Sequence, residues 1–164
     1  MSTLQHKLTL NKFKIKRDKH LKDFDQKFSD FLADVEFSGE ADCIKYAAFS
    51  KWDDKSGVRT TSRGDLKNWN HFTFNTWNEL MSVLKKFQQV KNYIGWFFID
   101  ADGPYYKMSI NAFLSHIQSI SNYATNNDRY DFGWVGGADD VGIIIGHNQP
   151  PSKDNKFRIS IWGI

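Results

Sequence analysis

Residues 131–163 read DFGWVGGADDVGIIIGHNQPPSKDNKFRISIWG, and this stretch decides the fold class. It contains three runs rich in aliphatic and aromatic residues, at 131–136, 141–147 and 156–163, which is the composition of β-strands. The loop between the first two runs, 137–140, is short and contains glycine, as hairpin loops do. The sequence therefore predicts a C-terminal antiparallel meander of three strands.

Three other segments show the spacing of amphipathic helices, in which apolar residues recur every three or four positions. These segments cover residues 20–37, 76–90 and 109–123. Thr76 and Glu79 have the spacing of a capping box at the start of the second helix, and Ser109 is a candidate cap for the third. Each helix has one apolar face, which must be covered by a sheet or by another helix.

Further strands are predicted before the meander. Residues 7–15 (KLTLNKFKI) alternate between apolar and polar with one slip, which suggests a strand with a bulge. The segments 43–49 and 71–74 are also β-rich, and 93–99 is apolar on both sides, as a central covered strand would be. We therefore expect a single α+β domain spanning 1–164. Its sheet is largely antiparallel, has about five to seven strands and packs against three amphipathic helices.

Composition and charge restrict the setting of the protein. The single cysteine, Cys43, cannot form a disulfide within the chain, and no apolar run reaches the length of a membrane span. These features predict a cytoplasmic protein without membrane contact. Residues 7–22 carry seven basic residues against Asp18 alone, a net charge of +6 in a chain whose total is +3. Such a basic segment can contact phosphates or an acidic partner. We favour a solvated strand and helix start, because the basic residues do not form one long stripe.

Two acidic pairs are candidates for chemistry. Asp100 and Asp102 follow the predicted strand at 93–99, and Asp139 and Asp140 lie in the predicted hairpin loop. Carboxylates two residues apart at a strand end point to one side and can bind Mg²⁺. Aspartates also hydrogen-bond their own backbone in turns, and we favour that interpretation. A Mg²⁺- or Mn²⁺-dependent hydrolase that uses these four aspartates is an alternative. No cofactor and no metal site is predicted.

The segment 51–77 interleaves large aromatic residues with basic ones. Its first part is rich in glycine, serine, threonine and aspartate, which indicates a loop or an irregular hairpin, and a long loop in a compact domain is usually functional. Tryptophan beside arginine is common at interface hot spots. The predicted partner-binding residues are Trp52, Arg59, Arg63, Lys67, Trp69, His71, Asp139 and Asp140.

The sequence contains no nucleophile elbow, no P-loop and no dinucleotide-binding glycine pattern, so we lean away from an enzyme. We expect a non-enzymatic protein-binding protein, analogous to the bacterial immunity-type inhibitors that neutralise a toxin or effector by covering its active site. The analogy is one of class, since such proteins share no motif. A nucleic-acid-binding protein that uses the basic N-terminal segment, with Lys12, Lys14, Lys16 and Arg17, is a second alternative.

Overall fold

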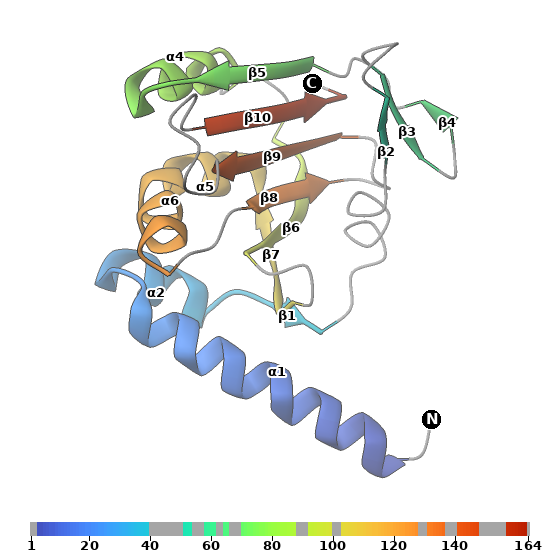
Figure 1. The fold of residues 1–164 in the computed structure, drawn as a ribbon. Coiled ribbons are helices and arrows are strands. Elements are labelled where there is room, and N and C mark those ends of the chain that lie inside the picture. The colour runs from blue at the N-terminus through green and yellow to red at the C-terminus, as the bar shows by residue number, and fades with distance from the viewer. Residues whose placement is uncertain are drawn as a thin grey trace.

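In a computed structural model of the chain, two antiparallel sheets combine with helices (Figure 1). The structure describes residues 3–39, 51–53, 58–61, 64–65, 70–87, 92–99, 103–127, 131–136, 141–147 and 157–163. The strand predicted at 43–49, with Cys43, lies outside these residues. The single-domain organisation stays a prediction.

The larger sheet has seven strands in the order β1-β7-β6-β8-β9-β10-β5, and every neighbouring pair is antiparallel. Its strands are β1 (Phe37–Ser38), β5 (Asn70–Phe74), β6 (Ile94–Phe98), β7 (Tyr105–Ser109), β8 (Asp131–Gly136), β9 (Val141–His147) and β10 (Phe157–Trp162). The last three strands are hydrogen-bonded in chain order, which confirms the predicted C-terminal meander. The α+β fold class and the antiparallel sheet are therefore confirmed.

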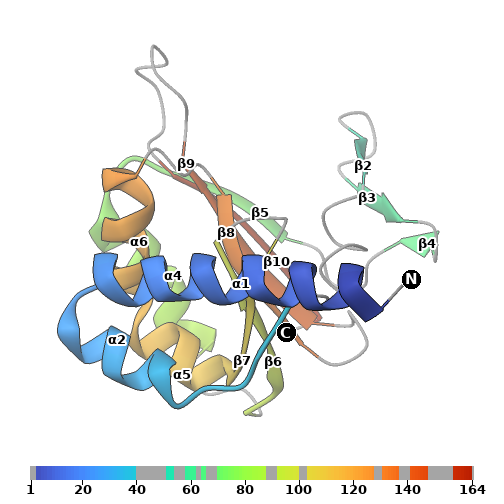
Figure 2. The ribbon, with the colours of Figure 1, turned by 90° about the horizontal axis from the view of Figure 1, so that it is seen from below.

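Helices cover one face of this sheet, and the small sheet lies on the other side, as Figure 2 shows. The helices are α1 (Thr3–Asp23), α2 (Gln26–Ala33), α4 (Trp77–Phe87), α5 (Ile110–Ser115) and α6 (Ile117–Asn126). The small sheet contains β2 (Lys51–Asp53), β3 (Val58–Thr61) and β4 (Gly64–Asp65). Helices α2, α4, α5 and α6 form the covering layer, whereas α1 runs past the β1 edge of the large sheet.

Strand alternation explains the two buried clusters. Neighbouring residues in a strand face opposite sides of the sheet. Phe97 of β6 belongs to the main core under the helices, and Phe98 belongs to a smaller cluster with Val135 and Trp162. The register pairs Phe97 with Trp134, and Trp134 with Ile143, in one row of the main core. The interior strand β6 is thus apolar on both faces, as predicted.

The three predicted helices are present, but two of them are divided. The segment 20–37 contains the end of α1 and the whole of α2, with a break at Phe24 and Asp25. Asp25 causes the restart, because its carboxylate accepts a hydrogen bond from the Phe28 amide at 3.1 Å, as an N-cap does. The apolar residues predicted to lie on one stripe still face the core, and Phe28 is fully buried.

The segment 109–123 is divided in the same way, and the predicted caps are confirmed. Ser109 accepts a hydrogen bond from the Ala112 amide, and α5 then gives way to α6 at His116. At the start of α4, Thr76 and Glu79 exchange the reciprocal hydrogen bonds of a capping box. These local signals were readable because caps depend only on residues three positions apart.

The strand predicted at 7–15 is wrong, since this segment lies inside α1. Its apolar residues match a period of two, but Phe13 alone among them is buried. Residues 3–23 contain no glycine or proline and are rich in lysine and leucine, which are good helix formers. Summed over this length, helix propensity outweighs a short alternation of apolar residues.

Candidate interaction surface on the N-terminal helix

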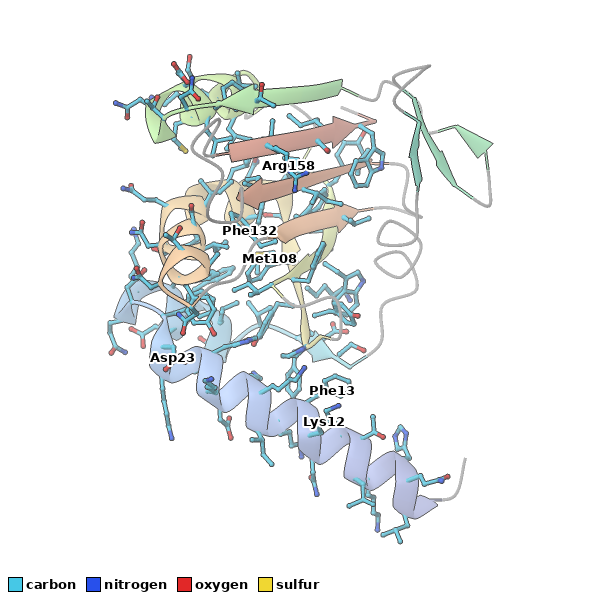
Figure 3. All side chains as sticks on the ribbon, in the orientation of Figure 1. Lys12, Phe13, Asp23, Met108, Phe132 and Arg158 are labelled. Carbon is cyan, nitrogen blue, oxygen red and sulfur yellow. The ribbon has the colours of Figure 1, made fainter. Side chains whose placement is uncertain are left out.

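Helix α1 is attached to the rest of the protein by one face, and Phe13 is the first anchor. Its ring packs on the backbone of Gly39 and against Gly103, and Figure 3 shows it on the side of α1 that faces the sheet. A side chain at Gly39 would collide with this ring. Gly103 has φ +75°, a conformation that favours glycine, and an added Cβ there would also approach the Phe13 ring. Both glycines therefore leave room for the helix.

The next anchors are two cations that the sequence assigned to possible phosphate contacts. The Lys16 ammonium donates a hydrogen bond to the Gly103 carbonyl at 3.2 Å. The Arg17 guanidinium donates to the Ala33 carbonyl at 2.6 Å, at the end of α2, and lies over the Phe37 ring. A cation at a helix C-terminus satisfies carbonyls that have no partner within the helix. Lys16 and Arg17 thus contribute to folding contacts.

His20 is the fourth anchor, and it is buried. Its Nδ1 lies 2.7 Å from the Tyr106 hydroxyl on β7, a hydrogen bond whose direction depends on the imidazole tautomer. The same ring contacts the edges of Phe24 and Tyr123, at centroid separations of 6.0 and 5.8 Å. A buried polar ring needs such a partner, because an unsatisfied nitrogen would destabilise the fold. This contact fixes the rotation of α1 about its own axis.

The opposite face of α1 is apolar and exposed. Leu4, Leu8 and Ile15 have exposed fractions of 66%, 60% and 71%. Residues turn by about 100° per step in an α-helix, so these three side chains lie along one strip, away from Phe13 and His20. Every described side chain from residue 4 to 12 is exposed. The strip, with Asn11 between its members, is called the outward seam below.

Lysines lie on both sides of the outward seam. Lys7 and Lys14 follow one side, and Lys12 and Lys19 follow the other, and all four are exposed. The seam is therefore an apolar strip with a cationic border. Sequence reasoning missed it because it treated residues 7–15 as a strand. The signal was nevertheless present, as apolar residues at helical spacing between lysines.

A second polar group lies in the layer that supports α1. His116, at the junction of α5 and α6, stacks on Phe28 and Phe31 of α2, each at a centroid separation of 4.8 Å. Burial lowers the pKa of His116 below its usual value, and nearby Lys27 lowers it further, while Asp25 opposes the shift. A hydrogen bond from Ser119 lowers the pKa of Asp25, with further hydrogen bonds acting in the same direction against partial burial.

Three of the eight predicted partner-binding residues lie within the described part of the chain. The backbones of Trp52, Arg59 and His71 lie in β2, β3 and β5, and Trp52 is paired with Arg59 across the small sheet. The remaining predicted residues, Arg63, Lys67, Trp69, Asp139 and Asp140, lie outside the described residues. Their role in binding stays a prediction.

Neither acidic pair can be placed, since Asp100 and Asp102, like Asp139 and Asp140, lie outside the described residues. Within the part of the chain that the structure describes, three or more His, Cys, Asp or Glu side chains do not gather into a potential metal site. Of the helices in the same part, none is both long and apolar enough to cross a membrane.

No family model, no curated protein and no solved structure matches the chain. Any functional proposal therefore depends on the contacts and exposed surfaces described above.

Proposed function

We propose that this protein is a non-enzymatic, cytoplasmic protein-binding protein that acts by occupying a macromolecular partner, in the manner of an immunity-type inhibitor. The observation that carries this proposal is the outward seam of α1. Single exposed aliphatic residues are common on protein surfaces. Here Leu4, Leu8 and Ile15 lie on one face of a helix whose other face is anchored to the body. Contiguous apolar surface of this kind is typical of interaction sites.

Burial of this surface would contribute favourable free energy to binding. Fully burying a leucine or isoleucine side chain contributes about 1.5–3 kcal/mol relative to leaving it exposed. More than half of each aliphatic seam side chain is exposed, so most of this free energy would be released only when a partner buries the seam. A partner that covers the seam therefore gains several such contributions without any rearrangement of the core.

The seam supports a protein partner over a nucleic acid. Two of the four cations named for phosphate contact, Lys16 and Arg17, donate to backbone carbonyls instead. The lysines that remain exposed on α1 flank aliphatic side chains, and phosphates offer those side chains no apolar surface. The hydrolase alternative depends on aspartates outside the described residues and stays a prediction.

Affinity capture from the native source tests the proposal. Tagged wild-type protein, the seam variant Leu8→Gln/Ile15→Gln and the control variant Leu10→Gln are compared. Leu10 lies on the same helix but off the seam, and it is less exposed than the seam residues. We expect one partner to be recovered by the wild type and the control and lost from the seam variant. The complex should re-form from purified components and suppress the partner's own activity.

Two results would contradict the proposal. One is a partner that binds the seam variant as tightly as the wild type. The other is a purified protein that catalyses a reaction by itself. Unfolding temperatures of all three proteins must agree for the comparison to be valid, and exposed positions usually satisfy this condition.

The segment 51–77 is tested separately, because its predicted contacts are independent of the seam. Replacing Trp69 and Arg63 by alanine should weaken partner binding and leave the unfolding temperature nearly unchanged, as expected for interface anchors. A large loss of stability would assign these two side chains to the core instead.

A further inference from the structure

The outward seam has the repeat of a coiled coil. In a heptad written abcdefg, Leu8 and Ile15 occupy a positions, and Leu4 and Asn11 occupy d positions. The next d position is Asp18, so the apolar strip ends at Ile15. The f positions lie opposite the seam; Phe13 and His20 occupy two of them and are buried, and His6 occupies a third and is exposed. The heptad register thus places the seam on the face of α1 opposite the residues that contact the body. Residues 4–19 span about 24 Å of helix.

The positions that flank the seam are almost entirely lysine. Lys7 and Lys14 fall at g, and Lys12 and Lys19 fall at e, all exposed. In paired helices the e and g side chains of one helix face those of the other and decide which partner is accepted. We infer that the outward seam binds one helix of a protein partner, and that this helix has apolar residues along its centre and carboxylates at its flanks. This inference rests on the proposed function, because it specifies the partner of the same surface.

The same charges exclude a second copy of this chain as the occupant. Two copies of α1 would bring lysines together at their flanks whether the helices were parallel or antiparallel, and like charges at such positions destabilise pairing. Asn11 in the seam adds a further constraint, since a single polar residue at a d or a position restricts register and partner.

Two other occupants are less compatible with α1. A helix that binds a membrane surface concentrates its apolar residues on one face and usually includes aromatic ones. In α1 the aromatic residue Phe13 faces the body, and the outward seam consists of aliphatic residues and Asn11. A nucleic acid would neutralise the lysines but leave Leu8 and Ile15 without an apolar surface to contact. A helix with apolar residues along its centre and carboxylates at its flanks would contact the aliphatic side chains and pair with the lysines.

The experiment uses the full chain and two synthetic helical peptides as probes. Both peptides have leucine and isoleucine along the seam and an asparagine placed to meet Asn11. One has glutamate at all e and g positions, and the matched control has lysine there. Calorimetric titration should show binding of the glutamate peptide and none of the lysine peptide. Leu8→Gln/Ile15→Gln should weaken binding about tenfold or more, as for truncated anchor residues, and Leu10→Gln should leave it within about twofold.

Charge reversal and salt supply a second readout. Lys12→Glu/Lys19→Glu should weaken binding of the glutamate peptide, whereas Lys85→Glu, an exposed lysine on α4, should not. Added salt should weaken the wild-type complex, because exposed flanking pairs are screened. Binding that ignores both changes would overturn the assignment of the lysines to the partner's carboxylates.

The remaining outcomes separate this inference from the proposed function. Equal binding of both peptides, or of neither, overturns the acidic-helix inference. Binding to vesicles of equal parts phosphatidylcholine and phosphatidylserine, or to a DNA duplex, in preference to the glutamate peptide also overturns it. If either happens while the native protein partner still requires the seam, the proposed function stands and the inference fails. If the native partner ignores the seam, the proposed function itself fails.

Discussion

The two halves of α1 differ in their surroundings, although they belong to one unbroken helix. Residues 4–12 contain no buried side chain, whereas Phe13 and His20 in the second half are buried and Lys16 and Arg17 are half-buried. Both halves contain lysines, and neither contains glycine or proline. The amino-acid composition thus accounts for the helical conformation of both halves. Contacts with the rest of the protein decide which half is buried.

This difference has a thermodynamic consequence. A helix of about ten residues is marginal in water without tertiary contacts, because the first turn is costly to form. The first half of α1 therefore extends from a second half that is already fixed by its contacts with β7, α2 and Gly103. A partner on the outward seam would bury side chains in a segment whose residues 4–12 are all exposed.

The largest expected effect of this difference is on amide hydrogen exchange. Amides of residues 7–12 should exchange through local fraying, and those of residues 20–23 only through much larger openings, so protection should differ by about a thousandfold or more. Exchange followed by NMR at single residues measures this. Similar protection along the whole of α1 would show that the two halves are equally held.

The next largest effect is on stability. Phe24 is buried and packs against Phe28 and Tyr123, at centroid separations of 4.7 and 4.3 Å. Phe24→Ala should lower the free energy of unfolding by about 3–5 kcal/mol, because it leaves a cavity. Leu8→Ala, in the exposed half, should change it by no more than about 0.5 kcal/mol. Urea unfolding measures both, and a comparable cost for Leu8→Ala would mean that the first half also packs on the body.

A smaller effect is expected at the hydrogen bond that fixes the rotation of the helix. Tyr106→Phe removes the hydroxyl that lies 2.7 Å from His20 Nδ1 and keeps the aromatic ring. The free energy of unfolding should fall by about 1–3 kcal/mol, the cost of removing a partner from a buried polar group. Tyr93→Phe, at a half-buried tyrosine outside this contact, is the control. Equal losses in the two variants would remove any special role for the His20 contact.

The smallest effect concerns pH. The pKa of His116 is lowered from 6.5 by burial, so the unfolded chain binds more protons than the folded protein between the two values. Stability should therefore fall as the pH drops through 6.5 toward the folded pKa. His116→Phe keeps the stacking on Phe28 and Phe31 and should abolish this dependence, which urea unfolding at about pH 7.5 and about pH 5 measures.

Asp25 also makes stability depend on pH, but in a different pH range from His116. Its pKa is lowered by the hydrogen bond from Ser119, so its contribution to stability is present above 3.8 and is lost as the pH falls through the folded pKa. This loss occurs at more acidic pH than the loss due to His116. If His116→Phe leaves the pH dependence near neutrality unchanged, another group is responsible for it.

The sequence by itself determined the meander, the caps at Ser109 and Thr76, and the helical faces that carry Phe28, Leu80 and Ile120. These features depend on residues that are close in the chain, so periodicity and capping patterns report them. The partner-binding residues predicted in 51–77 depend on contacts between distant segments, and they stay predictions.

Only the tertiary structure decided which face of α1 is free. The sequence places aliphatic residues and lysines all around this helix, and it contains nothing that assigns Phe13 to the body and Ile15 to the outside. That choice follows from the backbone of Gly39 and Gly103 and from the Tyr106 hydroxyl, which accommodate Phe13 and His20 on one side. Because these partners come from segments far along the chain, the outward seam became apparent only once the fold had brought them to α1.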